Sequence, residues 1–141
     1  MGDLHWAGGV LRDCKDVSIM VQLVMDDQDI RLQVVFFRAE HGGEPVREWL
    51  KSLPLDEKRI VGEDIKTVQF GWPLGMPIVR KMEPGLWEVR SRLKNRIARV
   101  LFTVNNNKMV LLHGFIKKSD KTPQDDLNVA HQRLAQLRGE K

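Results

Sequence analysis

Several residue types are scarce in this chain of 141 residues, and each scarcity excludes a class of protein. Cys14 is the single cysteine, so no internal disulfide can form. The four histidines are scattered, so the sequence predicts neither a structural metal nor a bound cofactor. No apolar run approaches the roughly 18 residues that span a bilayer, and the N-terminus lacks the basic-then-apolar pattern of a secretory signal. We therefore expect a cytoplasmic protein without a membrane partner.

The common catalytic motifs are also missing. The chain contains no GxxxxGK[ST], no GxGxxG after a strand, no HExxH and no GxSxG, so nothing favours a nucleotide, zinc-protease or serine-hydrolase site. Asp120, Asp125 and Asp126 suggest a magnesium site at first sight, but they lie at the start of a predicted helix, where carboxylates stabilise the helix dipole. A metal-dependent nuclease is therefore the weaker alternative.

Positive charge is concentrated in one part of the chain. Residues 1–30 carry two basic and six acidic side chains, whereas residues 78–121 carry eleven lysines and arginines against three acidic side chains. Such clustering favours a polyanionic partner, because fixed cations release counterions from phosphates when they bind. A solvated basic surface explains the same charge, and charge alone does not separate the two.

Hydrophobic periodicity predicts one α+β domain over residues 25–141, preceded by an extension over residues 1–24 that adds an edge strand or is poorly ordered. Met25 is an alternative start. We expect two layers, with helices on one face of an antiparallel or mixed sheet. Strands are predicted over residues 31–37, 86–93, 97–104 and 109–117, a helical hairpin over residues 45–53 and 55–70, and a C-terminal helix with Thr122 as its N-cap.

Alternation along the predicted strands collects polar side chains on one sheet face. Glu88, Arg90 and Arg92 share a face of the first strand after the loop at residues 71–77. Arg99 interrupts an otherwise apolar strand and needs a partner, for which Glu88 is the candidate. The full predicted cluster is Glu88, Arg90, Arg99, His113 and Lys117 or Lys118. Cations around a carboxylate suit chemistry at a phosphodiester, although an ion pair and a structural histidine account for the same residues.

The chain resembles the phage-derived HigB-like branch of the RelE/ParE toxin superfamily. The resemblance is carried by residues 85–90 (GLWEVR), 99–102 (RVLF), 110–118 (VLLHGFIKK) and 121–123 (KTP), with Ala130, residues 45–50 (PVREWL) and residues 73–81. It covers residues 31 to 137 and implies a RelE-like fold, in which a helical hairpin and a C-terminal helix surround a curved antiparallel sheet. It also implies a toxin of a type II toxin–antitoxin pair, with a HigA-like helix-turn-helix antitoxin as partner.

The implied activity is cleavage of mRNA, usually on the ribosome and without a metal, by attack of the RNA's own 2′-OH on the adjacent phosphate. By position, Glu88 and Arg90 match polar site residues, and Arg99 matches the arginine at the scissile phosphate. Lys117 and Lys118 match a basic pair. The implied RNA-binding residues are Lys81, Arg92, Arg96 and Lys121. Because the chain has no tyrosine, where several relatives place one near the site, proton transfer falls to Glu88, His113 or Lys118 as hypotheses.

Two other function classes stay open. ParE-like relatives poison DNA gyrase by binding and need no catalytic cluster, and a basic accessory protein would bind nucleic acid without cleaving it. Under the nuclease hypothesis an Arg99→Ala variant abolishes toxicity, whereas a pure binding protein loses affinity gradually.

Overall fold

A computed structural model describes residues 31–117 and 121–139 of the chain. The predicted extension over residues 1–24, the alternative start at Met25, and Lys118 with Asp120 lie outside the described residues. The elements are β1 (Gln33–Phe36), α4 (Pro45–Ser52), α5 (Leu55–Gly71), β2 (Val79–Glu83), β3 (Leu86–Arg92), β4 (Ile97–Asn105), β5 (Lys108–Lys117) and α6 (Gln124–Leu137). None of the helices among the described residues is long and apolar enough to cross a bilayer.

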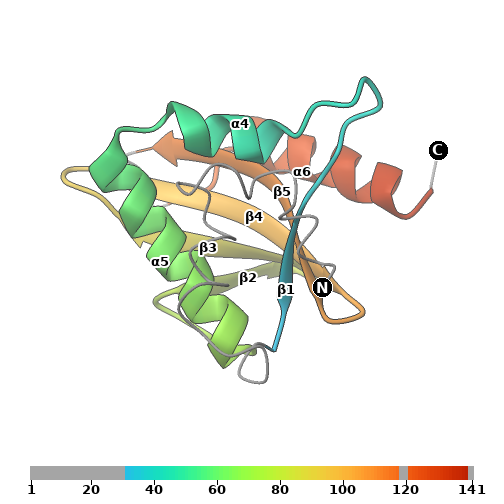
Figure 1. Cartoon of the computed structure of the whole chain (residues 1–141). Helices are drawn as coiled ribbons and strands as arrows, with labels where there is room; N and C mark the ends of the chain where they lie inside the picture. The colour runs from blue at the N-terminus through green and yellow to red at the C-terminus, as the bar shows by residue number, and fades with distance from the viewer. Residues whose placement is uncertain (1–30, 118–120, 140–141) are drawn as a thin grey trace.

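The strands form one mixed, curved sheet in the order β1-β5-β4-β3-β2 (Figure 1). The predicted meander is confirmed, since β3, β4 and β5 pair with antiparallel neighbours through short turns. Asn95 and Asn106 take positive φ in those turns, a conformation that asparagine tolerates. β1 pairs in parallel with β5, so the first and last strands of the domain lie side by side.

The strand β2 was missing from the sequence-based prediction. It pairs antiparallel with β3, with Arg80 opposite Glu88 and Lys81 opposite Trp87. Its five residues (VRKME) are mostly polar, so the hydrophobic period of a strand is weak there. The Pro84-Gly85 pair was the available signal, because Gly85 takes a φ of 82° in the tight turn between the two strands.

The helices α4 and α5 begin and end close to the predicted positions, and each buries one apolar stripe. They do not form the expected hairpin. Figure 1 shows them meeting at a wide angle, and α4 packs on β5 and β1 whereas α5 packs on β3. The extended backbone of Leu53 and Pro54 turns the chain between them. Each helix therefore covers its own part of the sheet.

Helices cover both faces of the sheet, so the expectation of two layers was wrong. Val100 and Phe102 of β4 pack in the hydrophobic cluster that contains the buried side chains of α4 and α5. Leu101, on the opposite face of β4, packs in a second cluster with Ala130 and Leu134 of α6. A strand with apolar side chains in both directions needs cover on both sides, and α6 supplies it on the second face.

Candidate functional site

The strand register places the predicted cluster on the face of the sheet that α6 covers, called the α6 face below. Arg90 of β3 lies opposite Arg99 of β4, and Glu88 lies opposite Leu101, which in turn lies opposite His113 of β5. Lys117 shares this face at the end of β5, opposite Ile97. The predicted alternation of side chains is therefore confirmed.

Glu88 and Arg99 are completely buried, with 0% of each residue exposed. Their predicted ion pair is confirmed, although Arg99 Nη1 and Glu88 Oε2 lie 3.9 Å apart. Thr122 bridges the pair: its hydroxyl donates to Glu88 Oε2 at 2.5 Å and accepts from Arg99 Nη1 at 3.3 Å. We call Glu88, Arg99 and Thr122 the buried cluster. Removing one charge from such a pair leaves the other uncompensated in the interior, which is strongly destabilising.

Thr122 was predicted as the N-cap of the last helix, and this was wrong. Pro123 occupies the N-cap position of α6, without a side-chain cap hydrogen bond, and Thr122 precedes it. A threonine hydroxyl can donate one hydrogen bond and accept others. Here it donates to Glu88 and accepts from Arg99, so it is not used to cap the helix. The KTP motif identified the segment, but a local pattern does not indicate that its hydroxyl reaches two distant strands.

His113 is held by α6 through both ring nitrogens. Its Nε2 lies 2.7 Å from Asp126 Oδ1, and since the carboxylate only accepts, Nε2 carries the proton. Nδ1 lies 3.5 Å from Arg133 Nη1, which donates to the Leu112 carbonyl at 2.8 Å. The ring also stacks on Phe115. Burial lowers the pKa of the Arg133 guanidinium. These contacts tie β5 to α6, so Asp126 does more than complement the helix dipole.

Exposed and half-exposed cations of β2, β3 and β5 lie on the same face as the buried cluster, and Lys121 adjoins the cluster in the chain next to Thr122. Arg92, Lys117 and Lys121 are exposed, and Arg80 and Arg90 are half-buried. Arg80 joins them because its position in β2 is opposite Glu88; it was overlooked together with its strand. We call these five residues the basic face. Guanidinium and ammonium groups on a fixed surface suit the phosphate backbone of a nucleic acid.

Two of the predicted RNA-binding residues lie elsewhere. Lys81 is exposed, but in the register of β2 and β3 it lies opposite Trp87. Its side chain therefore belongs to the opposite face of the sheet. Arg96, in the turn after β3, donates to Glu57 Oε2 of α5 at 2.5 Å. Lys118, predicted beside Lys117, lies outside the described residues. The basic face is therefore built from part of the predicted set together with Arg80.

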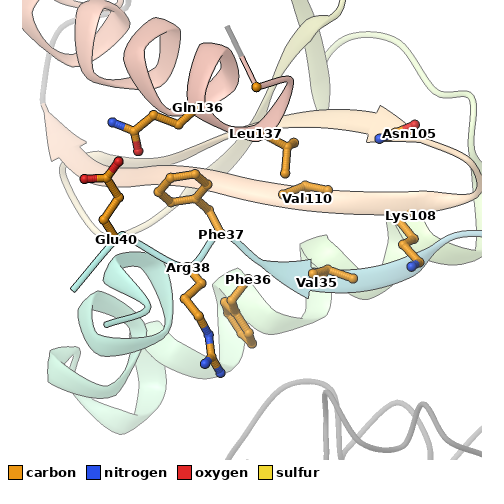
Figure 2. Close-up of a pocket in the computed structure, with 11 residues that line it drawn as sticks. Val35, Phe36, Phe37, Arg38, Glu40, Asn105, Lys108, Val110, Gln136 and Leu137 are labelled. Atoms are coloured by element: carbon orange, nitrogen blue, oxygen red, sulfur yellow. The ribbon is translucent and has the colours of Figure 1, made fainter. Parts of the chain in front are cut away.

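No group of three or more metal-ligating side chains is present among the described residues. A hollow of about 670 Å³ lies at the other end of the α6 face, beside β1. Figure 2 shows Leu137 projecting from the end of α6 toward Val110, with Phe37 beside them. Lys108 and Arg38 are its cationic lining residues, and none of the predicted site residues lines it. The hollow is thus separate from the basic face.

Comparison with known proteins places this arrangement in a family. A family model described as phage-derived protein Gp49-like (DUF891) matches residues 48–135. The match includes α5, the strands from β2 to β5 and most of α6, and so contains the whole basic face and the buried cluster. No curated protein matches the chain. Because the family model covers more than half of the sequence, the chain belongs to the phage-derived Gp49-like family, which is associated with RelE-like and other toxin-like proteins.

Proposed function

We propose that the chain is the toxin of a type II toxin–antitoxin pair and acts on mRNA as a metal-independent endoribonuclease of the HigB-like kind. One observation carries the proposal: the basic face brings five cations from β2, β3, β5 and the segment before α6 to one end of a single sheet face. The Gp49-like family and its association with toxins support it. A ribosome carrying mRNA and a HigA-like antitoxin are the proposed partners, in the cytoplasm.

The proposed chemistry uses position and charge rather than a metal. The 2′-OH of the RNA attacks the adjacent phosphate, the bond to the 5′ oxygen breaks, and a cyclic phosphate remains. Arg90, Lys117 and Lys121 offset the charge that grows on the phosphate oxygens in the transition state. The backbone on either side is held by Arg80 and Arg92, which aligns the attacking and leaving oxygens.

The roles proposed for Glu88, Arg99 and His113 follow from their burial and their contacts. Glu88 and Arg99 expose no surface, so in this arrangement they do not contact RNA. Their proposed role is to hold the exposed cations around them in position. The nitrogens of His113 are turned to α6, which favours a structural tie over proton transfer. Proton transfer is left to a lysine of the basic face or to groups of the ribosomal substrate.

A second function is favoured by the same burial. Glu88 is fully buried and both ring nitrogens of His113 face partners from α6, and pure binding needs neither residue as an acid or base. A toxin that binds without cleaving, as ParE-like gyrase poisons do, or a nucleic-acid-binding accessory protein, would use the basic face alone.

The test compares two double variants with equal loss of charge. Arg92→Ala/Lys117→Ala removes two exposed cations of the basic face, and Lys51→Ala/Arg59→Ala removes two exposed cations from α4 and α5. Each protein is expressed by induction in a bacterial host, and mRNA 5′ ends are mapped together with ribosome footprints. We expect wild type and the α4/α5 variant to cut translated messages, and the basic-face variant to cut at least about ten-fold less.

Other outcomes reject the nuclease. Growth arrest with intact messages and an SOS response would assign the chain to gyrase poisoning. If the protein binds RNA but causes neither cleavage nor growth arrest, the nucleic-acid-binding accessory protein becomes the supported function. Equal cutting by both double variants would show that the basic face is not the site. Circular dichroism of the purified variants confirms that each is folded before its activity is compared.

A further inference from the structure

Thr122 lies at the junction of three elements. It precedes Pro123, the N-cap of α6, is 7% exposed, and reaches β3 through Glu88 and β4 through Arg99. Among the described residues Glu88 Oε1 has no hydrogen-bond partner, and Glu88 Oε2 accepts a hydrogen bond of 2.5 Å from the Thr122 hydroxyl. The direct distance from Glu88 to Arg99 is 3.9 Å, longer than a hydrogen bond. The hydroxyl therefore supplies the hydrogen bonds that the two charges do not make with each other.

The residues next to this junction belong to the basic face. Lys121 is exposed and immediately precedes Thr122 in the chain. Arg90 lies two residues after Glu88 on the same face and opposite Arg99. A shift of Thr122 along the sheet would move Lys121 relative to Arg90, because one peptide unit separates the anchored residue from the lysine.

We infer that Thr122 is a positioning residue: its hydroxyl anchors the segment before α6 to Glu88 and Arg99 and thereby fixes the backbone of Lys121 next to the buried cluster, for contact of the lysine with an RNA phosphate. The anchoring step rests on the contacts within the chain. The contact with RNA rests on the proposed function. Thr122 itself touches no substrate, since it is buried.

Two variants of Thr122 separate the hydroxyl from the shape of the side chain. Thr122→Val keeps the branched shape and removes the hydroxyl, whereas Thr122→Ser keeps the hydroxyl. Thr67→Val is the matched control, because Thr67 is exposed on α5 and its hydroxyl donates to the Glu63 carbonyl of the same helix. Thr122→Cys, with a weak donor in place of the hydroxyl, replaces the valine variant if that variant does not fold.

The first measurement is hydrogen exchange of the backbone amides of residues 127–130, the first in α6 whose N–H groups have helical acceptors. We expect exchange to be about ten-fold faster or more in Thr122→Val and unchanged in Thr122→Ser and Thr67→Val. Equal exchange in wild type and Thr122→Val would overturn the anchor. This result is independent of RNA, so it decides the anchoring step whether or not the proposed function holds.

The second measurement is binding of a single-stranded RNA oligonucleotide at several salt concentrations. Lys121→Ala should reduce the slope of log K against log salt by about 0.7, the value for one contact to a single strand. Thr122→Val should reduce it similarly, Thr122→Ser should not, and the double variant Lys121→Ala/Thr122→Val should lose no more than either alone. Additive losses would show that Thr122 does not act through Lys121. Absence of RNA binding by wild type would reject the proposed function and the RNA contact together, while the exchange result still decides the anchor.

Discussion

At the scale of single residues, Gly114 of β5 leaves no room for a side chain. A Cβ at this position would collide with the ring atoms Cε3, Cζ3 and Cδ2 of Trp49, which packs from α4 onto β5. Carbon atoms do not approach this closely, so either the ring or the strand must move if a side chain is added. The glycine in the run LLHGF is thus explained by the close approach of an indole ring.

Replacing Gly114 with alanine should therefore lower the free energy of unfolding by about 1–3 kcal/mol, the usual cost of overpacking a core. Urea denaturation followed by circular dichroism measures the change. Gly75→Ala is the matched control, since nothing lies within 4 Å of a Cβ at that position. Trp49→Leu should suppress much of the cost of Gly114→Ala when the two are combined. Equal stability of Gly114→Ala and Gly75→Ala would contradict the close contact with Trp49.

The pair of Glu88 and Arg99 shows which features of the site the sequence predicts and which it does not. Alternation in β3 and β4 located Glu88 and Arg99 on one face and paired them correctly, because side-chain direction in a strand depends only on position. Their complete burial depends on α6, which follows many residues later, and on the Thr122 hydroxyl. An Arg99→Ala variant therefore leaves a buried carboxylate without its counter-charge, and loss of toxicity in that variant would not distinguish catalysis from unfolding.

At the scale of elements, α5 carries a carboxylate whose environment is unfavourable to its charge. Burial raises the pKa of Asp64 above its ordinary value of 3.8; a hydrogen bond with the Ser91 side chain opposes this shift in the pKa, and the Glu63 carboxylate adds to it. A folded-state pKa above the unfolded value means that the folded chain holds the proton more tightly. The stabilisation of the fold by the protonated Asp64 carboxyl is fully present at pH below 3.8, and it is lost as the pH rises through the raised pKa.

We accordingly expect Asp64→Asn to be more stable than wild type at pH 7, by less than about 1 kcal/mol because the group is only half-buried. The difference should disappear, or reverse, at pH 3, where the wild-type carboxyl is protonated. Thermal denaturation of both proteins across this range tests the sign. Glu63→Gln, a change at an exposed neighbour on the same helix, should show a smaller pH-dependent gain. If Asp64→Asn is less stable than wild type by the same amount at pH 7 and at pH 3, burial of the Asp64 charge has no cost.

Elements with a clear hydrophobic period were predictable, and elements defined by their partners were not. The stripe of Val61, Ile65 and Val68 identified α5 from sequence because one helix face supplies most of its buried residues. The polar strand β2 lacks such a stripe and is held by its pairing with β3. The angle between α4 and α5 likewise depends on which strands they cover, and no local pattern encodes that choice.

At the scale of the whole molecule, the uneven distribution of charge along the sequence becomes an uneven distribution in space. The eleven cations of residues 78–121 do not all face one way: Lys81 lies on the opposite face and Arg96 pairs with Glu57. Four residues of the basic face come together because β2, β3 and β5 present alternate residues on the α6 face, and Lys121 joins them from the segment before α6. The parallel pairing of β1 with β5, which completes the sheet at its far edge, joins segments too distant for sequence patterns to connect.

If this concentration of charge is what binds RNA, position must matter more than net charge. Single-stranded RNA binding weakens with salt by about 0.7 in log–log slope for each phosphate contact. Arg92→Ala/Lys117→Ala should therefore reduce the slope by about 1.4 in a fluorescence anisotropy titration, because both exposed side chains belong to the basic face. Lys51→Ala/Arg59→Ala changes the net charge by the same amount on α4 and α5 and should leave the slope nearly unchanged. Equal reductions in both variants would mean that RNA responds to the overall positive charge of the chain, and that the basic face has no privileged role.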